Sequence, residues 1–248
     1  MIEEKGLYAY LDTFLNFIYP RDIFCIVCGN GITKHEKYSM CQMCMEKVPF
    51  ITSRACEKCG KPLESMYLPS KCPDCVSGLH LFHKGYSCVE YNEQMKQLVY
   101  GLKYGKKRYF AYHMAEIMVD KLKKQALENM DVIVPVPLHK TKYRERDFNQ
   151  AQLLGKYIAK GFEWPMDHKN LIRIKTTLSQ NKLSKEERKD NVKNAFALMN
   201  KEEFTDKKIL LVDDIYTTGS TINACCKELL KAKPKAIYVI TFTTGRNM

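Results

Sequence analysis

Two aspartates followed by a run of hydroxyl side chains occur in the segment KKILLVDDIYTTGST, residues 207–221. The apolar run before Asp213 and Asp214 predicts a strand, and the residues after Gly219 have the pattern of a helix. A helix N-terminus binds phosphate because its unpaired amides point outward and its dipole is positive there. The residues that would build this phosphate loop are Thr217, Thr218, Gly219, Ser220 and Thr221.

The two carboxylates indicate a ligand that carries other groups besides a phosphate. Carboxylate oxygens accept hydrogen bonds from sugar hydroxyls, or hold Mg²⁺ together with waters. A ribose that carries a 5′-phosphate satisfies both the acids and the loop. An ordinary strand–turn–helix needs a single capping hydroxyl, fewer than the segment offers. The sequence contains no G-x-x-x-x-G-K-[ST] motif, so a nucleotide P-loop of that type is excluded.

Eight cysteines occur in two copies of one spacing, C-x2-C-x12-C-x2-C. A C-x2-C turn presents two thiolates to one ion, and two such turns complete a tetrahedron around zinc. Buried apolar cysteines have no reason to recur in fixed pairs. The spacing therefore predicts two zinc ions, whose ligands are Cys25, Cys28, Cys41, Cys44, Cys56, Cys59, Cys72 and Cys75.

The spacing alone leaves the pairing of these turns open. Pairing in sequence order joins 25/28 with 41/44 and 56/59 with 72/75, and an interleaved arrangement is the alternative. In either case sulfur fills all four positions around each ion, so both zinc ions are expected to be structural. Cys225 and Cys226 lie outside this frame, in a helical pattern, and are expected in the core.

The composition favours a globular protein of the cytoplasm. The chain has 248 residues, of which 45% are hydrophobic, enough for a core. The N-terminal apolar run is broken by Asp12 and Asn16, unlike a signal peptide, and no later run approaches the ~18 apolar residues of a membrane span. We expect no membrane insertion, and cysteines that are thiols or metal ligands.

The net charge of +12 lies entirely in residues 81–248, because residues 1–80 carry nine basic and nine acidic side chains. The excess is concentrated in runs such as KYGKKR (103–108) and KTKYRER (140–146). Such runs form either a solvated surface or a site for an anionic partner, such as polyphosphate or nucleic acid.

The chain after residue 84 alternates between strand and helix patterns. Strands are expected at 85–91, 131–138, 170–174, 207–214 and 235–244, and helices at 92–104, 109–125, 149–161 and 220–232. This alternation predicts an α/β domain with a parallel sheet covered on both faces, whose ligands bind at the carboxyl ends of the strands. The polar stretch 175–195 is long for a connection, and is expected to be either a lid or a solvated insertion.

The segment ILLVDDIYTTGST resembles the phosphoribosyl-pyrophosphate (PRPP) binding loop of type I phosphoribosyltransferases. Together with the cysteine turns, VPVPLHKTKYRERDFNQAQLLGKYIA and RIKTTLSQNKLSKEERKDNVKNAF, it is similar to the ComF (ComFC-like) family of DNA-uptake and competence proteins. One departure occurs where the usual R-G-F-N-Q reads Arg146-Asp147-Phe148-Asn149-Gln150. The resemblance implies an N-terminal helix over 1–20, a double zinc ribbon over 21–80, and a phosphoribosyltransferase-like, Rossmann-like domain over 85–248.

The resemblance also implies roles for individual residues. Asp213 and Asp214 would hold the ribose diol of PRPP or ribose 5-phosphate, and the phosphate loop its 5′-phosphate. Arg144 and Arg146 would be the cations of a pyrophosphate loop, and Mg²⁺ would neutralise the departing pyrophosphate. The stretch 175–195 would be a flexible hood, with motif positions at Gln180, Arg188 and Asn191.

Two functions follow as expectations. One is a PRPP-binding protein that works with single-stranded DNA during uptake, transformation or recombination, with a competence helicase or recombination protein as partner. The other is a free-standing phosphoribosyltransferase with a small-molecule acceptor. Aromatic and basic side chains interleave in one segment, where they could stack bases or simply pack helix faces: Tyr100, Lys103, Tyr104, Lys106, Lys107, Arg108, Tyr109 and Tyr112.

Overall fold

The computed structural model describes residues 23–245, except 34–35, 53, 65–68, 79, 126, 128, 177–186 and 188–189. The chain divides into two compact units, Met1–Val48 and Pro49–Met248. The helix predicted over residues 1–20 lies outside the described residues.

The first unit is a small cysteine-rich module. Its elements are the 3₁₀ helix η1 (Lys37–Ser39) and the helix α2 (Gln42–Glu46). An antiparallel bridge joins Phe24 to Gly31 around the first cysteine turn. The elements that the structure describes in this module are short, which is the situation in which a bound metal supplies folding energy.

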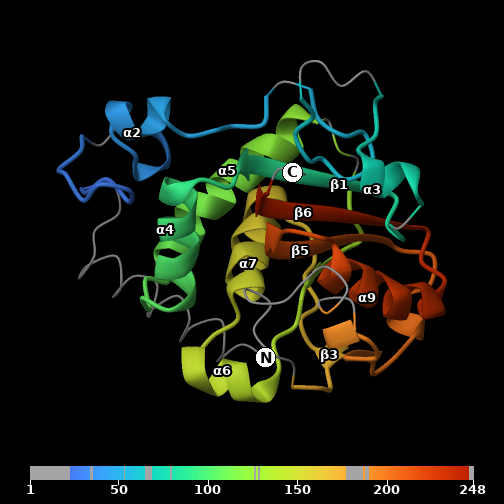
Figure 1. The fold of residues 1–248 in the computed structure, drawn as a ribbon. Coiled ribbons are helices and arrows are strands. Elements are labelled where there is room, and N and C mark those ends of the chain that lie inside the picture. The colour runs from blue at the N-terminus through green and yellow to red at the C-terminus, as the bar shows by residue number, and fades with distance from the viewer. Residues whose placement is uncertain are drawn as a thin grey trace. The chain divides into compact units, whose positions relative to one another are not determined.

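The second unit contains a four-stranded parallel sheet with the strand order β1-β6-β5-β2 (Figure 1). The strands are β1 (Lys84–Glu90), β6 (Ala236–Thr244), β5 (Lys208–Tyr216) and β2 (Val132–Pro135). Ile209 to Val212 of β5 are fully buried, as expected for a parallel strand that is covered on both faces. The expected α/β class and its parallel sheet are confirmed.

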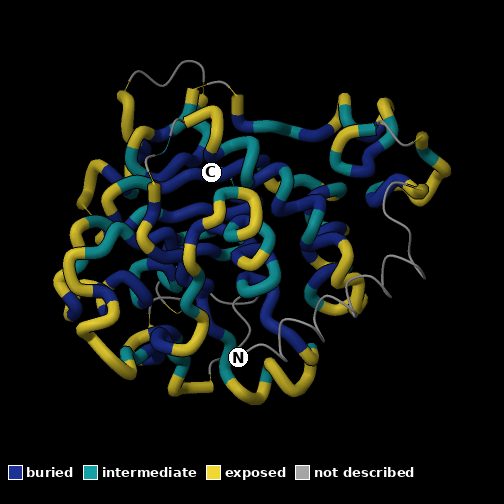
Figure 2. Tube along the Cα trace, turned by 180° about the vertical axis from the view of Figure 1, so that it is seen from behind, coloured by how far each residue is buried: buried dark blue, intermediate teal, exposed yellow. Residues whose placement is uncertain are grey.

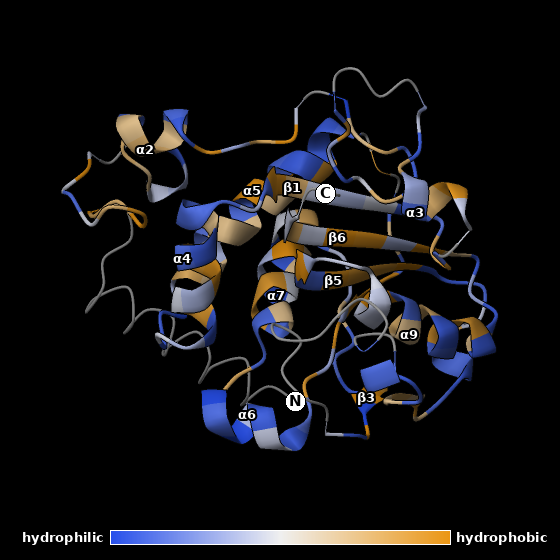
Figure 3. Ribbon diagram, viewed as in Figure 1, coloured by the Kyte–Doolittle hydropathy of each residue, from blue (hydrophilic) through white to orange (hydrophobic). Residues whose placement is uncertain are grey.

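Helices cover both faces of this sheet. Helices α5 (Phe110–Lys124) and α7 (Gln150–Phe162) pack together on one face, and α9 (Ser220–Leu229) packs on the other (Figure 1). Figure 2 shows the strands as a continuous buried layer inside exposed connections, and Figure 3 shows that β5 and β6 are among its most apolar segments. The expected core position of Cys225 and Cys226 on α9 is confirmed, since both are fully buried.

The remaining elements are short, apart from α4 (Glu93–Lys103), which begins at a capping side chain. The Asn92 carboxamide oxygen accepts from the Met95 amide at 2.9 Å. The short elements are α3 (Pro73–Val76), α6 (Lys140–Arg146), η3 (Glu202–Phe204) and η4 (Leu230–Ala232), and the antiparallel pair β3 (Leu171–Arg173) and β4 (Phe196–Leu198).

Two of these elements differ from the sequence-based prediction. The strand expected at 170–174 forms, but it pairs with β4 outside the main sheet. The segment after VPVP contains the helix α6, which has no buried residue and is mostly hydrophilic in Figure 3, so it lacks the apolar periodicity that predicts a helix. Among the described helices, none has the length and apolar character required to cross a bilayer.

Candidate functional site

The cysteines form two clusters, grouped in sequence order. Within each cluster the four sulfurs lie within 4.8 Å of one another. The sulfurs of Cys28 and Cys41 are 3.7 Å apart, and those of Cys59 and Cys72 are 3.6 Å apart. A tetrahedron with Zn–S bonds of about 2.3 Å has edges of about 3.8 Å. The donor set and its spacing therefore fit zinc, and two zinc-binding sites of four cysteines each, with no open position, are present as expected.

The acid pair lies near the carboxyl end of β5, in the middle of the sheet. Asp213 is in register with Thr241 of β6, and its carboxylate accepts from the Asp214 amide at 2.9 Å. Asp214 is buried, and its carboxylate lies 2.7 Å from the Lys103 ammonium at the end of α4. One acid is thus neutralised by a helix that the sequence motif does not include, and both acids line one pocket.

The acid pair changes the proton affinity of both Asp213 and Lys103. Burial, followed by the neighbouring Asp214 charge, raises the pKa of Asp213 to about 7, although Lys103 and the Asp214 amide act against this rise. Burial alone would lower the pKa of Lys103, but the attraction and hydrogen bond of Asp214 raise it above its ordinary value. Near neutral pH the Asp213 carboxyl group is therefore partly protonated and partly ionised.

The phosphate loop turns sharply into α9. Gly219 precedes the helix with φ +75°, and a Cβ atom there would lie 2.6 Å from the Tyr216 hydroxyl, so glycine is required. The Thr218 hydroxyl lies 2.8 Å from the Ser220 hydroxyl and 3.4 Å from the Ser220 amide, and so it orders the turn. The loop residues that line the pocket are Thr217, Gly219, Ser220 and Thr221.

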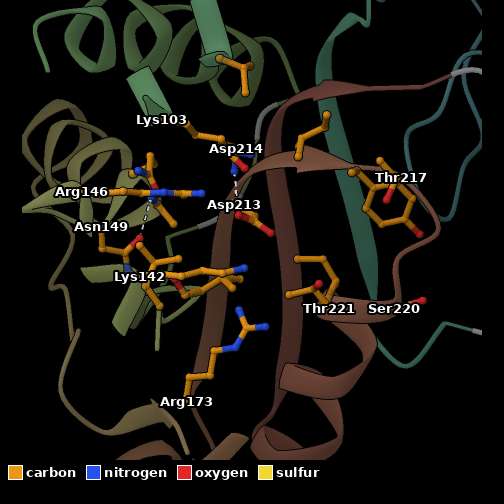
Figure 4. A pocket seen from close by; sticks show the side chains of 18 of the residues that line it. Lys103, Lys142, Arg146, Asn149, Arg173, Asp213, Asp214, Thr217, Ser220 and Thr221 are labelled. Carbon is orange, nitrogen blue, oxygen red and sulfur yellow. Dashed lines mark hydrogen bonds and ion pairs between the residues drawn. The ribbon is translucent and has the colours of Figure 1, made fainter. Parts of the chain in front are cut away.

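The pocket joins these parts into one cavity of about 170 Å³. Figure 4 shows Lys142, Arg146 and Arg173 reaching toward the acid pair, and the loop residues Ser220 and Thr221 lying on the other side of it. Together with Lys103, four cationic side chains of the described residues line the cavity. Burial, followed by the nearby cations Arg173 and Arg146, lowers the pKa of Lys142, whereas burial alone lowers the pKa of Arg173 and the Asp213 charge acts against it.

Arg146 is held in position by its neighbours. Its guanidinium donates to the side-chain amide oxygen of Gln150 at 3.1 Å and to the Tyr104 hydroxyl at 3.3 Å. It also lies over the Tyr104 ring, 4.9 Å from the centroid. The predicted cation Arg146 is therefore fixed at the pocket wall, whereas Arg144 on the same helix lies beside a shallower pocket with Leu138, Lys140 and Tyr143.

The aspartate that replaces the usual glycine ends α6 in a left-handed conformation. Asp147 has φ 64° and ψ 2°, a region that glycine enters without cost and that aspartate tolerates better than most residues. Its carboxylate lies 3.6 Å from the Lys106 ammonium, and its carbonyl accepts from Arg108 at 3.2 Å. The substitution therefore keeps the turn that glycine would form.

Several residues of the predicted site remain outside this geometry. Gln180 and Arg188 lie outside the described residues, and Asn191 is partly buried but is not among the residues lining the pocket. Lys103, Lys142 and Arg173 line the pocket but were not predicted as site residues, because they come from three different elements, and the quoted segments that contain Lys142 and Arg173 do not show which of their side chains reach the pocket. The only available signal was the basic character of 103–108 and 140–146.

Comparisons with known proteins agree with this arrangement. Residues 14–76 match the double zinc ribbon domain, and residues 154–247 match the phosphoribosyl transferase domain. The chain is 31% identical to Competence protein F of Haemophilus influenzae, with 91% of this chain and 97% of that protein covered. It is 29% identical to Competence protein ComFC of Bacillus subtilis, covering 91% and 95%. It is also 29% identical to DNA utilization protein YhgH of Salmonella typhimurium, covering 82% and 88%. The chain therefore belongs to the ComF family of competence proteins, which join a double zinc ribbon to a phosphoribosyltransferase-like domain.

Proposed function

We propose that the pocket binds PRPP. The observation that carries the proposal is the arrangement of three groups around one cavity: the phosphate loop, the acid pair and the cluster of four cations. The loop suits the 5′-phosphate, the carboxylate of Asp213 suits the ribose hydroxyls, and the cations suit the pyrophosphate. The acids lie between the other two groups, as the ribose lies between the two ends of PRPP.

Magnesium is part of this proposal. Hard carboxylate and phosphate oxygens are the donors that Mg²⁺ prefers, usually with several waters retained, and Asp213 with the ligand's phosphates would supply them. When bound, the ion would neutralise pyrophosphate as it leaves. Lys142, Arg146 and Arg173 would hold the same leaving group from the protein side, and Asp213 would orient the ribose so that an acceptor can approach C1 from the opposite face.

The second part of the proposal is that the protein handles single-stranded DNA in DNA uptake, transformation or recombination. The names of the relatives, competence proteins and a DNA utilization protein, support this setting. Tyr100, Tyr104 and Tyr109 are exposed beside the basic segment 103–108, where rings can stack on bases and cations can contact phosphates. Tyr112 instead packs edge-on against Tyr157. A protein partner from the competence or recombination machinery belongs to the same proposal.

A free-standing phosphoribosyltransferase is the second candidate. Tyr91 and Tyr100 line the same pocket as the acid pair, so a planar acceptor could rest against them beside the ribose. Release of pyrophosphate from PRPP with a purine, pyrimidine or amine acceptor, in the absence of DNA, would favour this candidate. Tight PRPP binding without turnover over a broad acceptor panel would favour a binding role.

Isothermal calorimetry with PRPP and Mg²⁺ tests the proposal. The wild type should bind, and an Asp213→Asn, Asp214→Asn variant, which keeps the shape of both side chains, should lose at least tenfold in affinity. Arg144→Gln is the matched control, because Arg144 lies on α6 but is not among the residues lining the cavity. A wild type that does not bind, or a double variant that binds as tightly, would rule the site out.

A further inference from the structure

The second cysteine cluster packs directly beneath the phosphate loop. Cys56, Cys59, Cys72 and Cys75 are buried in one hydrophobic cluster with Tyr216 at the end of β5 and with Ile222 and Cys225 on α9. The turn between the first two cysteines also contacts β1. The Gly85 amide donates to the Lys58 carbonyl at 2.7 Å, and a Cβ at Gly60 would lie 2.7 Å from the Gly85 carbonyl oxygen. The ribbon is therefore part of the core of the ligand-binding unit.

Tyr216 is the side chain through which the ribbon reaches the loop. Its ring is only 2% exposed, and its hydroxyl touches the loop backbone, since a Cβ at Gly219 would lie 2.6 Å from it. The Lys61 ammonium lies 5.4 Å from the ring centroid and 3.6 Å from the Asp74 carboxylate, and both residues lie within the second ribbon. The ring thus fills the space between the ribbon and the turn that carries the phosphate site.

A chain of hydrogen bonds fixes the Tyr216 hydroxyl. The Leu81 amide donates to the Asn223 carboxamide oxygen at 3.2 Å, so the Asn223 nitrogen faces His80 Nδ1, 3.1 Å away. Asn223 therefore donates to Nδ1, and the proton of His80 is on Nε2, which donates to the Tyr216 hydroxyl at 3.0 Å. His80 follows the ribbon in the sequence and Asn223 lies in the first turn of α9, so these bonds tie the ribbon to both sides of the loop.

The first cysteine cluster belongs to the other compact unit. Its four cysteines belong to the unit Met1–Val48, and none of them is a member of the cluster that contains Tyr216. The two ribbons share a spacing but differ in what they pack against. Nothing in the repeated sequence pattern distinguishes them, so the difference appears only in the fold.

We propose that the second zinc site, acting through Tyr216 and His80, positions the phosphate loop for the sugar-phosphate, and that the first zinc site does not. Tyr216 and His80 are positioning residues: the ligand touches the loop, and they hold the loop in its binding conformation. Loss of the second zinc would free its two cysteine turns, release the Tyr216 ring, and leave the loop amides without a fixed direction. This inference rests on the proposed function, because it concerns affinity for the same ligand.

The first test compares three ligands on Tyr216→Phe, with calorimetry as the readout and zinc content measured on the same samples. The variant should keep both zinc ions and bind ribose 5-phosphate and PRPP about tenfold more weakly, the loss expected for one hydrogen bond. Binding of pyrophosphate, which would use the opposite wall of cations, should not change. A general loss of structure would instead weaken all three ligands.

The His80 variants test the direction of the hydrogen bond. The amide nitrogen of His80→Gln can replace Nε2 as donor to Tyr216, so this variant should retain affinity for ribose 5-phosphate, whereas His80→Leu should lose it to about the extent of Tyr216→Phe. Equal affinity in Tyr216→Phe, His80→Leu and the wild type would overturn the inference, provided that the wild type binds. A wild type that binds none of the three ligands would instead remove the proposed function on which it rests.

The ribbons themselves are compared with paired variants. The double variant Cys25→Ser, Cys28→Ser should lose one zinc per chain and bind ribose 5-phosphate as the wild type does. The double variant Cys56→Ser, Cys59→Ser should lose one zinc per chain and more than tenfold in affinity for ribose 5-phosphate. Equal loss of affinity in both variants would contradict the asymmetry. Should the second variant fail to fold, the Tyr216 and His80 variants still decide the outcome.

Discussion

The Lys103 ammonium lies 2.7 Å from the Asp214 carboxylate and so joins the end of α4 to the carboxyl end of β5. The Asp214 side chain is only 6% exposed, and a buried carboxylate needs a partner of opposite charge. Both acids line the cavity, and Asp213 is the less deeply buried of the two. The ion pair also brings Tyr100, one turn earlier on α4, to the pocket wall.

Removing the Lys103 charge should destabilise the fold. In Lys103→Met the Asp214 carboxylate stays buried without its partner, and the free energy of unfolding in urea should fall by roughly 3 kcal/mol. Lys103→Met combined with Asp214→Asn removes both charges and should recover most of this loss. If the single variant unfolds within about 1 kcal/mol of the wild type, the ion pair does not hold α4 to the sheet.

Stability should depend on pH through Asp213. Its pKa is raised from 3.8 to about 7 in the folded state, so between those values the folded chain holds a proton that the unfolded chain has released. Stability must therefore fall as pH rises from about 4 to about 7, with a limiting slope of about 1.4 kcal/mol per pH unit, and level off above. The Asp213→Asn variant should lack this fall in stability. Identical pH dependence in urea unfolding of both proteins would contradict the raised pKa.

The turn at Asp147 should favour glycine over alanine. Because φ is 64° there, Asp147→Ala keeps a Cβ in the left-handed region but loses the polar group that can hydrogen-bond locally. Asp147→Gly removes the Cβ and so relieves the strain. Thermal or urea unfolding should find the glycine variant more stable than the alanine variant by about 1 kcal/mol. Equal stabilities would mean that the turn relaxes to another conformation.

Binding of single-stranded DNA should weaken with added salt. If Lys106, Lys107 and Arg108 contact phosphates, changing all three to glutamine should reduce the slope of log affinity against log salt by about 2, at about 0.7 per contact on single strands. Fluorescence anisotropy with a labelled oligonucleotide measures this slope.

The matched control for this change is Lys123→Gln with Lys124→Gln. Both residues are exposed and lie at the opposite end of α5 from Arg108. This variant should leave the salt slope nearly unchanged. An equal decrease per charge removed in both variants would indicate a response to net charge alone. No binding by the wild type at low salt would remove DNA from the proposal.

The sequence predicted those parts of the site that are local. The acid pair and the phosphate loop could be recognised because strand, turn and helix are contiguous between Lys207 and Thr221. The cysteine spacing predicted both metal sites for the same reason. Lys103, Lys142 and Arg173 could not be predicted, since α4, α6 and β3 are brought together only by the strand order and by the burial of Asp214.

The different surroundings of the two ribbons also lay beyond sequence reasoning. Identical spacing implies identical coordination, but it carries no information about packing. Tyr216 lies between the predicted strand and the predicted phosphate loop, and only the fold reveals that its ring is buried in one cluster with the second set of cysteines. Long-range contacts of this kind depend on tertiary packing, which a local pattern does not encode.

The most direct test of the central claim is the crystal structure of the protein with PRPP and Mg²⁺. We expect the 5′-phosphate at the amides and hydroxyls of 217–221, the ribose diol at Asp213, and the pyrophosphate among Lys103, Lys142, Arg146 and Arg173. Density for the ligand outside this cavity, or with the 5′-phosphate among the cations and the pyrophosphate on the loop, would contradict this expectation.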